Sequence, residues 1–359
     1  MSVLAAIGVL AILIVVHELG HFSAARLQGI KVSKFSIGFG PVLLKYDGKE
    51  TEYAIRAFPL GGYVGFPDDD PDSDISLDDP DLLRNRPVFD RAIVISAGVI
   101  ANLIFAYFLL VGQANVMGVQ DINYQQGVLI PEIISAEVSP ARASGLESGD
   151  VIIAIDGETL PIGEEGMEIL RRRIQDSPEK SLNFMVKRET DVFEVNITPE
   201  LGENDKGKIG VMLAPNGDVT RRHPSNFMEG FTIGAQQFER YVKLTVQGFG
   251  QLLTNFQESA TQVAGPVAIV AVGAELAKSD LGNLFQFGAL ISINLAIINI
   301  LPLPALDGGQ LVFLLFEGVR GKPLPNQLQE GIMQTGLVLL LGLGVFLILR
   351  DTVNLAFLR

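Results

Sequence analysis

Two histidines and a glutamate near the start of the chain have the spacing of a metal-dependent hydrolase. The segment "HELGH" carries His17 and His21 four residues apart, with Glu18 directly after the first histidine. On a helix, residues four apart share one face, so both imidazoles can bind the same metal ion. Glu18 could then act as a base toward water. The motif is short, and the alternative is a pair of interfacial histidines at the end of a helix.

A catalytic zinc normally has three protein ligands, so a third must come from elsewhere in the chain. The chain has only three histidines, and the third, His223, lies in a charged segment typical of a surface. Glu317 ends the third apolar segment, where a charged residue is expected at the membrane interface. Asp307 differs, because it is the only charged residue between Asp280 and Glu317. A buried carboxylate without a partner is costly. A metal ion would provide the partner that the Asp307 carboxylate needs. The alternative is that the carboxylate accepts hydrogen bonds from free backbone amides at a helix break.

The composition indicates a membrane protein. Hydrophobic residues make up 48% of the 359 residues, and charged residues make up 19%, below the roughly 25% of soluble domains. The formal net charge of −14 argues against a nucleic-acid partner. Because the chain contains no cysteine, disulfides and thiol catalysis are excluded.

Long apolar segments predict a polytopic α-helical membrane protein with four transmembrane helices, since a spanning helix needs about 20 mostly apolar residues. The third segment contains Asp307 and is interrupted by Pro302 and Pro304. A broken helix is tolerated at membrane depth where it is buried or lines a cavity. The four segments are residues 3–25, 92–111, 284–316 and 331–349.

Basic residues predict the orientation of these helices. Lysines and arginines gather at both ends of the loop between the first two segments, which predicts a cytoplasmic loop. Residues 116–283 and both termini are then extracytoplasmic. The first and third helices enter from the same side, so the histidines and Asp307 are expected at a similar depth, toward the cytoplasm. The basic residues are Arg26, Lys31, Lys34, Arg84, Arg86 and Arg91.

The two loops have different patterns. Strand-like runs around Asp47-Gly48 predict a β-hairpin, and Gly61 and Gly62 allow a close backbone approach. The acidic stretch 68–81 is interpreted as a solvated loop, with a regulatory or ion-binding role as the alternative. In the outer region, residues 126–200 predict short strands around one helix, and residues 226–278 predict amphipathic helices at the membrane interface.

Together, these motifs are similar to those of a known family. "HELGH" at 17–21, "FPLGGYV" at 58–64 and "NILPLPALDGG" at 299–309 resemble the site-2 protease family of intramembrane zinc metalloproteases, in its bacterial regulator-of-sigma-E branch. The resemblance implies that Zn²⁺ is bound by His17, His21 and Asp307. It also implies that Glu18 is the catalytic residue.

The same resemblance implies a substrate site. Asn299, Pro302 and Pro304 are expected to shape it near the zinc. The loop at about 35–64 is expected to be a cytoplasmic-side, membrane-reentrant β-hairpin whose edge, near Gly61 and Gly62, receives the substrate as an added strand. Asn102, in the segment "GVIAN", is a candidate substrate-binding residue, with helix packing as the alternative.

The outer region resembles a single bacterial PDZ domain of α+β structure, inserted between the membrane halves. Gly127, Val128 and Leu129 would then lie near its carboxylate-binding loop. The expected domains are an N-terminal membrane half with the hairpin, the PDZ domain, an interfacial amphipathic helical linker and a C-terminal membrane half. Their boundaries are 1–115, 116–205, 206–283 and 284–359.

The expected function is intramembrane zinc proteolysis of single-span membrane proteins, such as anti-sigma factors or signal-peptide remnants, in the bacterial inner membrane. The expected partners are these substrates, the lipid bilayer, and peptide or protein C-termini at the PDZ domain. One rival is a PDZ scaffold without protease activity, which predicts a missing glutamate or ligand. The other is a metal transporter, which predicts more intramembrane ligands. The second and fourth apolar segments contain no His, Asp or Glu.

Overall fold

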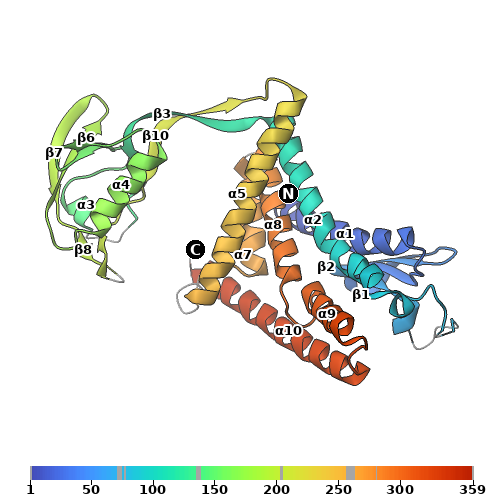
Figure 1. Ribbon diagram of the computed structural model, residues 1–359. Coiled ribbons are helices and arrows are strands. Elements are labelled where there is room, and N and C mark those ends of the chain that lie inside the picture. Colours follow the sequence, from blue (N-terminus) through green and yellow to red (C-terminus); the bar gives the residue numbers. More distant parts are fainter. Residues whose placement is uncertain are drawn as a thin grey trace. The chain divides into compact units, whose positions relative to one another are not determined.

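The computed structural model divides the chain into two compact units (Figure 1). One combines Met1–Gly118 with His223–Arg359, and the other is Val119–Arg222. Part of the acidic stretch 68–81 lies outside the described residues, which are 2–70, 75–76, 78–134, 139–202, 205–255, 263–279 and 281–357.

The first unit is a helical bundle. In the described part of the chain, four helices are long and apolar enough to cross a membrane, as predicted. They are α1 (Ser2–Leu27), α2 (Val88–Met117), α8 (Leu281–Ile300) and α10 (Asn326–Phe357). The other helices that the structure describes in this unit are η1 (Pro67–Asp69), η2 (Leu83–Asn85), α5 (Phe227–Thr254), α7 (Pro266–Ser279) and α9 (Asp307–Arg320).

The predicted interruption of the third apolar segment lies between α8 and α9. Pro302 and Pro304 lack a backbone N–H and disfavour helical conformation in the residue before each of them. Ala305 has a φ of +68°, which turns the chain sharply before the next helix. Because of this break, Asp307 becomes the first residue of α9.

Helices α1, α2 and α8 pack closely through small residues. A Cβ on Gly20 of α1 would lie 2.8 Å from the Cβ of Ala101 on α2. The Ser292 hydroxyl of α8 donates to the Asn102 carbonyl of α2 at 2.8 Å, and Ser292 is fully buried. Small residues allow membrane helices to approach this closely. α2 therefore helps to join the N-terminal and C-terminal parts of the bundle.

Helix α5 lies within the predicted linker at 206–283. It packs lengthwise on α2 and α8: Gly234 lies against Val111, and the Thr245 hydroxyl donates to Asn294 Oδ1 at 2.9 Å. The ring of Phe238 also contacts Tyr107. An amphipathic pattern identifies an apolar face but does not say whether lipid or other helices cover it. Here, helices of the bundle cover part of it, while Leu244 and Leu253 are each more than half exposed.

The predicted β-hairpin forms as two long bent strands, β1 (Lys34–Asp47) and β2 (Glu52–Gly65). Residues 42–47 pair with 52–56 in antiparallel fashion around the turn. Residues 34–37 lie between 52–55 and 62–65, because Lys34 pairs with both Glu52 and Gly65. Residues 62–65 therefore form one edge of a small four-segment sheet.

The second unit has α+β structure, as predicted. Its main sheet has the order β10–β3–β4–β6–β7, and α4 packs on it through Leu170 and Ile174, in a core with Phe184. The elements are β3 (Val119–Leu129), α3 (Pro140–Ala143), β4 (Val151–Ile155), β5 (Glu158–Thr159), α4 (Glu164–Gln175), β6 (Leu182–Arg188), β7 (Asp191–Ile197), β8 (Glu200–Leu201), β9 (Gly207–Lys208) and β10 (Ala214–Arg222).

The boundary expected at the end of this unit is wrong. The predicted domain ended at 205, but the unit continues to Arg222 because β10 pairs along β3, from Ala214 opposite Leu129 to Arg222 opposite Val119. The position of the segment 127–129 near a carboxylate-binding loop stays a prediction. Val128 is fully buried and pairs with β4 on one side and β10 on the other.

An ion pair joins the start of α2 to the end of α9. Arg91 and Glu317 form a hydrogen-bonded pair, with side chains 15% and 16% exposed. Removing one partner of a buried pair leaves the other charge uncompensated, at a cost of about 3 kcal/mol or more. Since α9 begins with Asp307, this pair helps to hold that carboxylate against the histidine helix.

We expect Glu317→Gln to lower the thermal stability of the detergent-solubilised protein markedly. The double charge swap Arg91→Glu with Glu317→Arg should recover part of the loss. The exposed pair Glu239–Lys243 provides the control, and Glu239→Gln should change the melting temperature little. Equal effects of Glu317→Gln and Glu239→Gln would contradict this role.

Candidate metal centre

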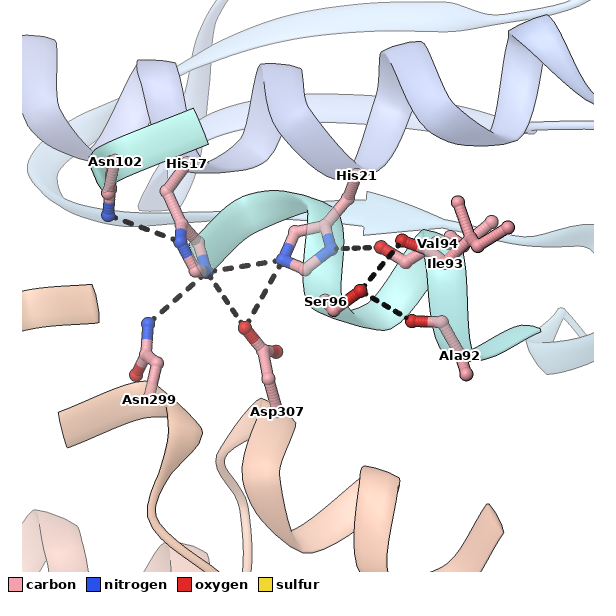
Figure 2. A network of polar contacts seen from close by, with 9 residues as sticks. All are labelled: His17, His21, Ala92, Ile93, Val94, Ser96, Asn102, Asn299 and Asp307. Atoms are coloured by element: carbon pink, nitrogen blue, oxygen red, sulfur yellow. Dashed lines mark hydrogen bonds and ion pairs between the residues drawn. The ribbon is translucent and has the colours of Figure 1, made fainter. Parts of the chain in front are cut away.

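The three predicted metal ligands meet at one point, although they come from opposite ends of the chain (Figure 2). His17 Nε2 lies 3.2 Å from His21 Nε2. Asp307 Oδ2 lies 3.3 Å from the first nitrogen and 3.5 Å from the second. The histidines are one turn apart on α1, and the carboxylate comes from the N-terminal end of α9. The structure therefore brings together the residues that the sequence proposed.

This triangle of atoms fits a tetrahedral zinc ion. Ligands about 2.0–2.1 Å from zinc in a tetrahedron are about 3.3–3.4 Å from one another, close to the three observed separations. Asp307 Oδ2 is also buried and has no hydrogen-bond partner, despite the nearby imidazoles. In the described part of the chain, these three residues are the group whose ligand atoms converge within 4.8 Å. A metal ion would satisfy that oxygen.

The environment of His21 selects the nitrogen that faces this point. Its Nδ1 lies 2.8 Å from the Val94 carbonyl oxygen of α2. Because a carbonyl only accepts, Nδ1 carries the proton and Nε2 keeps its lone pair. Such a partner behind a ligating histidine fixes the orientation of the ring. Val94 acts through its backbone, so side-chain patterns could not have revealed it.

Glu18 lies beside an edge of the sheet. A Cβ on Gly62 would come within 2.8 Å of Glu18 Cγ and 2.9 Å of the Ser36 carbonyl. The edge segment 62–65 therefore passes directly beside Glu18, and the absence of a side chain at Gly62 allows this approach. Gly61 has a φ of +125° and lies under the Phe39 ring.

Of the three residues predicted to shape the substrate site near the zinc, Asn299 lies beside His17, whereas Pro302 is exposed and Pro304 packs on α10. Asn299 is buried near the end of α8, with Nδ2 3.3 Å from His17 Nε2. Pro302 is exposed. Pro304 packs on α10, where a Cβ on Gly336 would lie 2.7 Å from the Pro304 carbonyl carbon. Pro304 also lines an apolar cavity of about 550 Å³, together with Leu303, Leu328, Ile332, Leu339 and others.

The structure corrects the substrate-binding interpretation of Asn102. Asn102 has no exposed surface, and its Nδ2 lies 3.3 Å from His17 Nδ1, on the side of the ring away from Asp307 (Figure 2). A substrate cannot reach it there. The alternative, a role inside the helix bundle, agrees with this position, because the neighbour of the Asn102 amide is His17 of α1.

Gly98 is a residue of this site that the sequence did not single out. It lies on α2 directly against both imidazoles: an added Cβ would clash with His21 Nε2 and lie 2.7 Å from His17 Cε1. The only signal in the sequence is its position four residues before Asn102, on the same face of the helix. α2 thus forms the back wall of the metal centre.

We expect Gly98→Ala to weaken zinc binding at least tenfold, because the added methyl group would displace an imidazole from the shared point. Gly112→Ala, on the same helix, provides a matched control because a Cβ there meets nothing within 4 Å. Zinc affinity is measured by competition with a chelator. Wild-type affinity in Gly98→Ala would contradict the geometry described above.

Comparison with known proteins gives consistent matches. The model of peptidase family M50 matches residues 5–343. A protein of Nostoc sp. strain PCC 7120, named as a zinc metalloprotease, is 61% identical over 99% of this chain and 97% of its own length. A zinc metalloprotease by name from Synechocystis sp. strain PCC 6803 is also 61% identical, over the whole chain and 96% of its length. The membrane metalloprotease ARASP, chloroplastic, of Arabidopsis thaliana is 49% identical over the whole chain and 80% of its length.

Solved structures match a smaller part. The PDZ domain of an SdrC-like protein from Listeria monocytogenes covers 25% of this chain and 88% of that chain, at 20% identity and a TM-score of 0.21. The corresponding domain from Listeria innocua covers 25% of this chain and 97% of that chain, at 22% identity and a TM-score of 0.22.

Proposed function

Because the chain belongs to peptidase family M50 and is a zinc metalloprotease, we propose that it cuts peptide bonds within the membrane. His17, His21 and Asp307 would hold the zinc, and Glu18 would be the catalytic carboxylate. The observation that carries this proposal is the convergence of three ligand atoms within 4.8 Å, in a bundle with four apolar helices long enough to cross a membrane.

The chemistry divides between the zinc and the protein. Zinc, when bound, would polarise the scissile carbonyl and lower the pKa of the attacking water, so that this water loses a proton more readily. Glu18 takes the proton from the attacking water and delivers it to the leaving amine. The Asn299 amide, 3.3 Å from His17 Nε2, is near enough to the reaction to donate a hydrogen bond to the substrate backbone. The imidazoles are oriented from behind by α2.

The substrate would bind to the edge of the sheet as an added strand. A transmembrane helix hides its backbone in its own hydrogen bonds, so it must unwind before hydrolysis. Residues 62–65 offer an edge beside Glu18, and β-addition holds a substrate in the extended conformation. This edge would keep the unwound segment in reach of the catalytic carboxylate.

Exposed apolar side chains support insertion of the β1–β2 sheet into the membrane from the cytoplasmic side. Phe39, Leu43, Leu44, Tyr46 and Phe58 are each at least half exposed. So many large apolar side chains on one small sheet call for an apolar environment. Buried against lipid, they would give the hairpin the reentrant position expected from the sequence.

The orientation and partners are part of the same proposal. The basic residues flanking the first loop favour a cytoplasmic loop, with both termini and the 119–222 unit extracytoplasmic, in the plasma membrane of a bacterium. Substrates would be single-span membrane proteins, with anti-sigma factors and signal-peptide remnants as candidate classes in regulated intramembrane proteolysis. Peptide or protein C-termini could bind the outer unit.

The test of this function uses purified protein in lipid vesicles with a single-span model substrate. We expect Glu18→Gln to bind zinc in equal stoichiometry to wild type but to lose cleavage by at least a hundredfold, because the proton-transfer group is gone. Mass spectrometry should place the wild-type cut within the transmembrane segment. Glu164→Gln, an exposed carboxylate on α4, is the control.

The rival functions predict other results. A scaffold or a metal transporter would leave the substrate intact in wild type as well. Cleavage that is unchanged in Glu18→Gln, or that falls only outside the apolar segment of the substrate, would reject intramembrane proteolysis through this carboxylate.

A further inference from the structure

The side-chain amide of Asn102 contains a buried oxygen without a hydrogen-bond donor. The residue is fully buried in α2, with Nδ2 3.3 Å from His17 Nδ1, while its Oδ1 is buried and has no partner. Its backbone carbonyl accepts from the Ser292 hydroxyl of α8, so the residue is held from both neighbouring helices. A buried amide oxygen without a donor costs about 1–3 kcal/mol.

The tautomer that zinc binding requires of His17 determines which end of the Asn102 amide must face the imidazole. If His17 binds zinc through Nε2, its neutral ring carries the proton on Nδ1. That N–H must donate, and the amide nitrogen opposite it cannot accept. The two ends of an amide have nearly the same shape, so a 180° rotation of its plane exchanges them. Oδ1 then faces the imidazole proton and is no longer orphaned.

We propose that Asn102 is a positioning residue for the zinc ligand His17. Its Oδ1 accepts the hydrogen bond from His17 Nδ1–H and thereby fixes the tautomer whose Nε2 faces Asp307. This inference rests on the proposed ligand set. It assigns Asn102 a role in holding the ring rather than in contact with the substrate.

The two histidines would then be supported in parallel by one helix. The Val94 carbonyl of α2 takes the Nδ1 proton of His21 at 2.8 Å, and the Asn102 side chain, two turns later on α2, takes that of His17. One acceptor is a backbone atom that no substitution removes. The other is a side chain, so the hydrogen bond to His17 is the one that a substitution can test. Losing such an outer partner typically costs 10–100-fold in metal affinity.

Two substitutions of similar shape separate acceptance from packing. In Asn102→Leu, the side chain fills the space but cannot accept a hydrogen bond. In Asn102→Asp, the ionised carboxylate accepts hydrogen bonds and cannot donate one. We expect Asn102→Leu to weaken zinc binding 10–100-fold in chelator competition, and Asn102→Asp to remain within about threefold of wild type. Wild-type affinity in Asn102→Leu would overturn the proposal, as would an equally large loss in Asn102→Asp.

A second measurement avoids dependence on the folding of a variant. The chain has three histidines, so nitrogen NMR of histidine-labelled, zinc-loaded wild-type protein has few imidazole signals to assign. We expect His17 and His21 both to be protonated at Nδ1. An Nδ1 of His17 that carries no proton would overturn the proposal.

The ligand set itself is tested apart from Asn102. His17→Ala should lose high-affinity zinc binding altogether. If His17→Ala binds zinc like wild type, the ligand assignment under the proposed function fails. If His17→Ala loses zinc while Asn102→Leu retains wild-type affinity, only the positioning role fails.

Discussion

The structure depends on one unfavourable group: a carboxylate held inside an apolar bundle. Asp307 has a buried oxygen with no hydrogen-bond donor, and its nearest polar atoms belong to two imidazoles on another helix. Such a group is tolerated only if something positive joins it. In the proposed ligand set, a zinc ion shared with His17 and His21 would supply that charge. The fold can therefore be understood as the set of contacts that bring these three atoms within bonding distance of one ion.

Helix α2 does most of this work although it supplies no ligand. Its glycine at 98 leaves room for both imidazoles, its Val94 carbonyl orients His21, and its Asn102 contacts His17. The same helix bonds to α8 through Ser292 and to α9 through Arg91. The helix that carries the histidines and the helix that carries the carboxylate are thus both held in place by contacts with α2. Preorganisation of this kind is what a metal site requires of its surroundings.

Much of the site could be predicted from the sequence because its signals are local or isolated. The spacing of His17 and His21 depends only on helix periodicity. Asp307 is conspicuous because it is the single charge in a long apolar segment, and the prolines before it predict the break that makes it a helix start. The hairpin has a turn signal and strand-like runs. Each of these features can be read without knowing what the segment packs against.

The features that were missed depend on the register between distant elements. Whether Asn102 faces a substrate or an imidazole is decided by how α2 is rotated against α1. The boundary at Arg222 depends on β10 pairing with β3 about a hundred residues earlier, and the packing of α5 along α2 and α8 depends on contacts between helices far apart in the chain. Val94 contributes a carbonyl, which every residue has. No pattern of side-chain types distinguishes these cases.

The most direct test of the central claim is zinc X-ray absorption spectroscopy of the purified protein. The account predicts four nitrogen or oxygen ligands at about 2.0–2.1 Å, with scattering from two imidazoles, and a loss of this signature in Asp307→Ala. A site with fewer than two imidazoles, or a spectrum unchanged in Asp307→Ala, would contradict the claim that the two membrane halves join at a shared zinc ion.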